Sequence, residues 1–258
     1  MTADSFPRRT ILIGLGATML APSARAQGLR EVPFVVSPMP VVEAMLDLAA
    51  LRPGERLVDL GSGDGRIVLA AARRGAEGLG VEIDGELVER ARRRAELENL
   101  QSRARFERGD LFGAVIRDAD VVTTYLLTSI NQRLRPKLLT ELRPGARVVS
   151  HAFDMGDWRP DGQQIIDDKQ LYLWIVPAVV GGDWRLTIAG ATHLLRFDQR
   201  YQQVSGGMDD RTLVASLRGN RLFFRADGRE FHGLVGDRTI TPDPAVAEAV
   251  QGWRAERA

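Results

Sequence analysis

The sequence contains no cysteine and only two lysines, Lys137 and Lys169, among its 258 residues. Without cysteine the chain cannot form a disulfide, a zinc–thiolate site or a cysteine nucleophile. Its three histidines are not spaced with carboxylates as metal ligands are, so we expect no metal. The net charge is +1, and a composition so nearly balanced gives no reason to expect a nucleic-acid partner.

The sequence also lacks a long apolar run. The longest, Ile11 to Ala21, falls short of the about 20 residues that a membrane-spanning helix requires. After residue 26 no apolar run reaches that length. We therefore expect a soluble mature chain without a transmembrane segment, and peripheral contact with a membrane stays open.

The first 26 residues have the three-part build of a signal peptide. Arg8 and Arg9 precede the apolar run, and Ala24-Arg25-Ala26 follows it as a small-x-small site. This pattern predicts a twin-arginine leader over 1–26, cleavage after Ala26 and a periplasmic location. The alternative is a frayed N-terminal helix on a cytoplasmic protein. The leader carries a charge of +2, which leaves −1 for the rest of the chain.

Apolar strands alternate with helices over 27–182, which predicts a parallel sheet with helices on both faces, an α/β domain. Beyond it, 183–241 is rich in turns and patterned as strands, with hairpin signals at Gly219-Asn220 and Asp227-Gly228. We expect a small C-terminal antiparallel β extension there. In 242–258, Asp243-Pro244 indicates the cap of a last helix, over 245–254.

A glycine-rich turn, Asp59-Leu60-Gly61-Ser62-Gly63-Asp64-Gly65-Arg66, follows the first expected strand. Glycines let the backbone approach a ligand, and open parallel sheets bind ligands at the carboxyl ends of their strands. Arg66 stands where a dinucleotide fingerprint has its third glycine. The carboxylates of Asp59 and Asp64 suit an ammonium group better than a pyrophosphate. The turn therefore predicts S-adenosylmethionine (SAM), with a nucleotide cofactor or a purely structural turn as the alternatives.

Two further acidic residues follow the next strands. Glu82 ends the second strand, where a carboxylate accepts hydrogen bonds from ribose hydroxyls. Asp110 follows the third strand, where it is placed to accept the adenine amino group with Leu111 beside the ring. The predicted cofactor site comprises Asp59, Gly61, Ser62, Gly63, Asp64, Gly65, Glu82, Ile83, Asp110 and Leu111.

The fourth strand ends at Tyr125, which is the candidate catalytic residue on the acceptor side; a core tyrosine is the alternative. The Asp/Asn-Pro-Pro-Tyr/Phe motif of enzymes that methylate amide or exocyclic base nitrogens is missing, which disfavours DNA adenine and glutamine as acceptors. His151 closes the fifth strand, where it acts either as a base or as the partner of a buried hydrogen bond.

Several stretches together resemble a known family. Val32–Pro38, Asp59–Val68 and Gly80–Glu82 resemble the lysine N-methyltransferases of the ATP synthase c-subunit and the adenine nucleotide translocase. Tyr125–Leu127 and Ser150–Trp158 are similar to their bacterial, often exported, class I relatives. The resemblance covers about residues 31–180. It implies a Rossmann-like seven-stranded sheet, SAM as cofactor and a protein lysine as the candidate acceptor.

Three functions remain open at this point. The first is a SAM-dependent methyltransferase that acts on protein lysine. The second is a small-molecule methyltransferase in which the β extension shapes the acceptor pocket. The third is an exported binding protein without turnover, because SAM is made in the cytosol and an exported enzyme has no evident supply.

Overall fold

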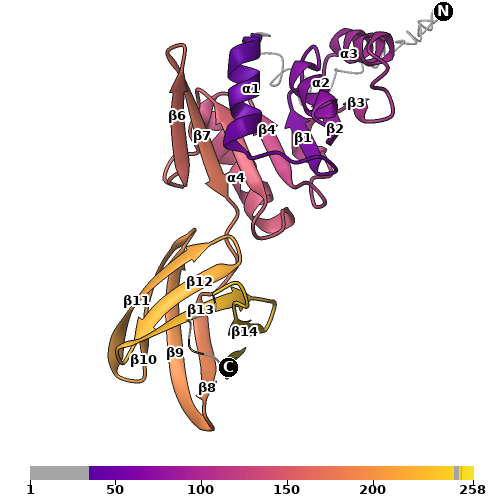
Figure 1. The fold of residues 1–258 in the computed structure, drawn as a ribbon. Coiled ribbons are helices and arrows are strands. Elements are labelled where there is room, and N and C mark those ends of the chain that lie inside the picture. Colours follow the sequence, from indigo (N-terminus) through magenta and orange to yellow (C-terminus); the bar gives the residue numbers. More distant parts are fainter. Residues whose placement is uncertain (1–34, 247–249, 251) are drawn as a thin grey trace, which may run out of the picture. The chain divides into compact units, whose positions relative to one another are not determined.

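A seven-stranded sheet forms the amino-terminal part of the described chain, which comprises residues 35–246, 250 and 252–258 of a computed structural model. The strand order is β3-β2-β1-β4-β5-β7-β6, with β7 antiparallel to both of its neighbours and the other neighbouring pairs parallel (Figure 1). The strands are β1 Arg56–Leu60, β2 Glu77–Glu82, β3 Ala104–Arg108, β4 Val121–Thr124, β5 Arg147–His151, β6 Gly162–Ile166 and β7 Lys169–Ile175. The expected α/β, Rossmann-like seven-stranded fold is confirmed.

Helices cover both faces of this sheet. They are α1 Met39–Leu48, α2 Arg66–Arg73, α3 Gly85–Leu97 and α4 Thr128–Glu141, with a 3-10 turn at Leu111–Gly113. Consecutive strand residues point to opposite faces: Leu57 packs with α1, α2 and α3, whereas Val58 packs with α4. Because helices cover both faces, the central strands β1, β4 and β5 are buried over nearly their whole length, whereas the edge strands β3 and β6 are largely exposed.

The carboxyl-terminal part is a closed barrel of eight antiparallel strands. The predicted β extension is therefore confirmed as antiparallel, and it runs further than 183–241. Aromatic side chains fill the interior, as is usual for a barrel of this size, among them Trp184, Phe197, Phe224, Phe231 and Trp253. The strands are β8 Gly182–Ile188, β9 Ala191–Arg200, β10 Gln203–Met208, β11 Arg211–Arg218, β12 Arg221–Ala226, β13 Arg229–Val235, β14 Thr239–Pro242 and β15 Trp253–Arg257.

The prediction of a C-terminal helix over 245–254 is wrong at the end of this range. There Trp253–Arg257 form strand β15. Trp253 and Ala255 are buried while Arg254 and Glu256 are exposed, which is the two-residue period of a strand. β15 pairs with β8 and with β14. The gain from covering two open strand edges outweighs the helix preference of this alanine-containing segment.

The chain passes from sheet to barrel at the edge where the parallel strands begin, because β7 runs antiparallel to β5. There the Ala178 N–H donates to the Gly219 carbonyl at 2.8 Å. A second contact joins the Trp158 indole N–H to Gln202 Oε1 at 3.0 Å. The predicted site lies at the opposite, carboxyl edge, so these contacts do not support the idea that the barrel shapes the acceptor pocket.

Two expectations concern the membrane and export. The proposed signal peptide over 1–26 lies outside the described residues and stays a prediction. Within the described part of the chain, no helix combines the length and the apolar character needed to cross a membrane.

Candidate functional site

The glycine-rich turn leaves β1 at Leu60 and enters α2 at Arg66. Gly61, Gly63 and Gly65 have φ values of 81°, 54° and 80°. This left-handed region costs other L-residues roughly 1–2 kcal/mol each. The N–H groups of Gly61 and Ser62 donate to the Val81 carbonyl at 2.9 and 3.1 Å, which fixes the turn against β2. The backbone shape, and not only the space above it, therefore requires these glycines.

In the described part of the chain, buried polar atoms without a partner gather at the carboxyl edge of the sheet, and one further such atom, Trp253 Nε1, lies in the barrel. In the described chain they include Ser62 Oγ after β1, Thr124 Oγ1 at the end of β4 and His151 Nε2 at the end of β5. Most buried polar atoms in proteins are hydrogen-bonded, so such a group of unpartnered atoms indicates where a ligand supplies the missing partners. The glycine backbone and these atoms together fit SAM.

Glu82 lies next to the turn, as the sequence predicts. One carboxylate oxygen accepts the Gly63 N–H at 2.9 Å and the other accepts the Asp84 N–H at 3.0 Å. Each oxygen retains a second lone pair that is free to accept a ribose hydroxyl. Glu82 therefore supports the turn and faces the position where the ribose is expected.

The predicted adenine side is more open. Asp110 is exposed, and its side chain accepts the Phe112 N–H at 2.9 Å, which caps the 3-10 turn. Ile83 is exposed and Leu111 is half-buried. Their contacts with the adenine ring stay predictions.

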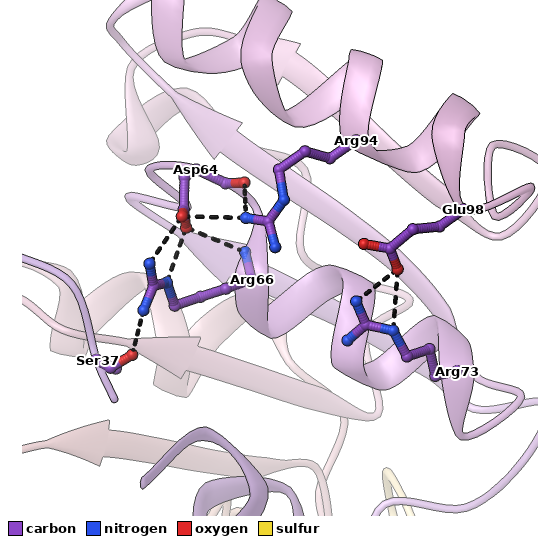
Figure 2. Close-up of polar contacts among 6 residues, drawn as sticks. All are labelled: Ser37, Asp64, Arg66, Arg73, Arg94 and Glu98. Carbon is purple, nitrogen blue, oxygen red and sulfur yellow. Dashed lines mark hydrogen bonds and ion pairs between the residues drawn. The ribbon is translucent and has the colours of Figure 1, made fainter. Parts of the chain in front are cut away.

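Asp64 has protein partners that the sequence did not reveal. Figure 2 shows its carboxylate between two guanidinium groups, with Arg66 at 2.8–2.9 Å and Arg94 at 3.0 Å. Burial alone would raise the pKa of Asp64, but the hydrogen bonds and charge of Arg66 and the charge of Arg94 outweigh burial and lower it. Its charge is already compensated, so Asp59 is better placed to receive an ammonium group.

Asp59 is buried and accepts a hydrogen bond from Thr123 Oγ1 at 2.7 Å. Among the residues that the structure describes, no basic side chain pairs with it. Burial raises the pKa of Asp59 to about 7; the Thr123 hydrogen bond opposes this rise, and the charges of Glu82 and Asp64 add to it. A buried carboxyl group that lacks a cation is a suitable partner for the ammonium of SAM.

We expect SAM affinity to fall as the pH drops through about 7, because the ammonium pairs with the carboxylate form of Asp59. The sign follows from the raised pKa, since Asp59 takes up a proton below this value and loses its charge. Asp59→Asn should bind more weakly at pH 8 and show a flatter pH profile. Calorimetry between pH 5.5 and 8.5 measures both curves, and parallel curves would contradict this role for Asp59.

The acceptor side is built around Tyr125. Its ring stacks on that of His151 with centroids 3.8 Å apart, and Phe153 lies 6.0 Å away. His151 is buried, and its Nδ1 shares a hydrogen bond of 2.8 Å with Ser37 Oγ. Burial, with a smaller effect of Lys169, lowers the pKa of His151 to about 4, so the ring is neutral at pH 7. The structure thus supports the buried hydrogen-bond role of His151 that the sequence left open.

Ser37 is the site residue that sequence reasoning missed. It lies within the Val32–Pro38 stretch of the resemblance, but nothing in that stretch indicated a partner. Its carbonyl accepts a hydrogen bond from Arg66 Nη1 at 2.7 Å (Figure 2). The segment before α1 is thereby tied to the cofactor turn and to β5.

Comparison with known proteins agrees with this geometry. The family described as the ANTKMT methyltransferase domain matches residues 59–162. A protein-lysine N-methyltransferase of Saccharolobus islandicus is 38% identical over 57% of this chain and 94% of its own. The adenine nucleotide translocase lysine N-methyltransferase of Mus musculus is 42% identical over 56% of this chain and 63% of its own.

A solved structure is also similar. It is described as an RNA methyltransferase from Salinibacter ruber in complex with S-adenosyl-L-homocysteine. It is 50% identical, covers 57% of this chain and 96% of its own, and has a TM-score of 0.56. The chain therefore belongs to the family of class I SAM-dependent methyltransferases that includes these lysine N-methyltransferases.

Proposed function

We propose that this chain methylates the ε-amino group of lysine in a protein. The observation that carries the proposal is the half-buried ring of Tyr125, which follows the end of β4 beside the end of β1 and stacks on a neutral histidine. An uncharged aromatic surface suits an alkylamine. The names of the relatives from Saccharolobus islandicus and Mus musculus point in the same direction.

SAM supplies a methyl carbon already activated by a positive sulfur, so the protein's task is positioning and desolvation. The glycine turn and Glu82 hold the cofactor, and Asp59 holds its ammonium. On the acceptor side, the rings of Tyr125 and Phe153 provide an apolar surface for the alkyl chain of the acceptor. Desolvation favours the neutral amine over the ammonium, and only the neutral amine has a lone pair for attack.

The test is to incubate the protein with methyl-labelled SAM and either a membrane-protein extract or total RNA. We expect label in a protein band, recovered after hydrolysis as methyl-lysine. The RNA arm is included because the similar solved structure is described as an RNA methyltransferase. Label confined to RNA or to small molecules would contradict the proposal. Intact SAM binding without any label would favour the exported binding protein.

We also propose that the chain is exported through its twin-arginine leader. Arg8-Arg9, the apolar run and Ala24-Arg25-Ala26 support this proposal. Twin-arginine export passes folded proteins, so SAM bound in the cytosol would allow one turnover. N-terminal sequencing of the native protein should begin at Gln27, and a start before Gln27 would contradict cleavage.

A further inference from the structure

A continuous set of contacts joins the cofactor turn to Tyr125 through Ser37. Arg66 pairs with Asp64 in the turn and donates to the Ser37 carbonyl at 2.7 Å. The Ser37 hydroxyl shares a hydrogen bond with His151 at 2.8 Å, and the His151 ring stacks on Tyr125 at 3.8 Å.

The exposure of this segment is unusual for a chain passing over a surface. Val35 and Val36 are 56% and 41% exposed, whereas Ser37 between Val36 and Pro38 is only 3% exposed. The segment therefore inserts one small polar side chain into the site and leaves its apolar neighbours outside. A purely structural strap would be expected to bury the valines and expose the serine.

We propose that Ser37 and His151 are positioning residues for the methyl acceptor, which hold Tyr125 so that its outward ring face binds a cationic alkylamine. The inference rests on the proposed function, because it takes the acceptor to be an amine. It adds Ser37 to the acceptor site and couples that site to the cofactor turn through Arg66.

Electrostatics explain why a neutral His151 suits the ring of Tyr125 on which it stacks. The face of a tyrosine ring attracts an ammonium group, and the attraction strengthens when water is excluded. One face of Tyr125 is covered by His151, and Tyr125 is only half-buried, so a cation would approach the part of the ring that His151 leaves uncovered. A protonated imidazole behind the ring would repel a cation in front of it. Burial and Lys169 keep the pKa of His151 low, so it provides a neutral support.

The acceptor class is a flexible alkyl chain that ends in a primary or partly methylated amine. Before transfer, the ammonium releases one proton to water. The nitrogen lone pair then forms the new N–C bond, while the C–S bond breaks and its electron pair remains on sulfur. Tyr125 binds the ammonium before this step and the methylammonium after it, so the same ring face accommodates substrate and product.

A binding experiment tests the inference without turnover. The protein has three histidines, so the side-chain NMR signals of His151 need to be distinguished only from those of His193 and His232. The full chain is saturated with S-adenosylhomocysteine and titrated with n-butylammonium or with neutral n-butanol. We expect n-butylammonium, and not n-butanol, to shift the His151 signals. Ser37→Ala and Tyr125→Leu should lose this shift, while Ser37→Thr should retain it.

A kinetic experiment separates positioning from a structural role. With a lysine-bearing protein acceptor, Ser37→Ala should raise KM about five- to tenfold, which corresponds to one cation–π contact. We expect the kcat of Ser37→Ala to stay within about twofold of the wild-type value and its S-adenosylhomocysteine affinity to be unchanged. The matched barrel variant His193→Gln should leave KM, kcat and this affinity at their wild-type values. Thermal unfolding of each variant verifies folding, and Ser37→Thr provides the conservative rescue.

The outcomes distinguish this inference from the function beneath it. Absence of methyl-lysine in the labelling experiment refutes the proposed function. The inference is refuted if n-butylammonium and n-butanol shift the His151 signals equally. It is also refuted if Ser37→Ala keeps the wild-type shift and the wild-type KM. Both results would stand even if lysine is methylated. A loss of cofactor affinity in Ser37→Ala equal to the loss of acceptor affinity would also overturn it, because Ser37 would then act only on the turn.

Discussion

Gly65→Ala should lower the free energy of unfolding by about 2–5 kcal/mol, which combines left-handed backbone strain with overpacking of the core. Gly65 has a φ of 80°. A Cβ atom at this position would lie 2.6 Å from Phe106 Cε1 and 2.8 Å from Ala91 Cβ. Both neighbours are buried, so neither is free to move aside. Urea unfolding monitored by circular dichroism measures the loss.

Two other glycines provide matched controls. Gly54 has a φ of 81°, but a Cβ atom added there would have no other atom within 4 Å. Gly54→Ala therefore isolates the backbone strain of roughly 1–2 kcal/mol. Gly113 has open space and no positive φ, so Gly113→Ala should change stability by less than about 0.5 kcal/mol. If Gly54→Ala and Gly65→Ala were equally destabilised, the close packing beneath the turn would not be the cause.

Glu82→Ala should weaken SAM binding by about 100-fold or more, because hydrogen bonds to a charged group contribute roughly 1.5–3 kcal/mol each. Two ribose hydroxyls lose their acceptor in this variant. The Gly63 N–H, which donates to Glu82 at 2.9 Å, also loses its partner within the turn. Both losses act on the cofactor. The SAM affinity of Glu82→Gln, which keeps an acceptor oxygen but loses the charge, should lie between those of the wild-type protein and Glu82→Ala.

The control for Glu82→Ala is Glu86→Ala. Glu86 is an exposed carboxylate in the first turn of α3. Its removal changes the net charge equally, so a similar loss of affinity in both variants would show that the effect is long-range charge and not contact with the cofactor.

The sheet was predictable because its information is local. Val121 and Val122 face opposite layers, and both are buried, so a continuous apolar run is sufficient to identify a central strand. The last strand was not predictable in this way. Its pairing partner β8 lies more than sixty residues earlier, and only closure of the barrel makes a strand preferable to a helix there.

The candidate site likewise has features that the sequence predicts and features that it does not. Gly61, Gly63 and Glu82 were predicted from their positions at strand ends, and the structure brings the turn and Glu82 together. The partners of the acidic residues depend on long-range contacts. Arg94 reaches Asp64 from thirty residues away, and Ser37 reaches His151 from 114 residues away. No local pattern in the sequence indicates either contact.

Titration calorimetry of SAM with the full chain is the decisive experiment on the glycine-rich turn. We expect one SAM bound per chain, an affinity about 100-fold weaker or worse in Glu82→Ala, and wild-type affinity in Glu86→Ala. No detectable binding to the folded wild-type protein, or equal affinities in the two variants, would contradict the assignment of the glycine-rich turn as the cofactor site.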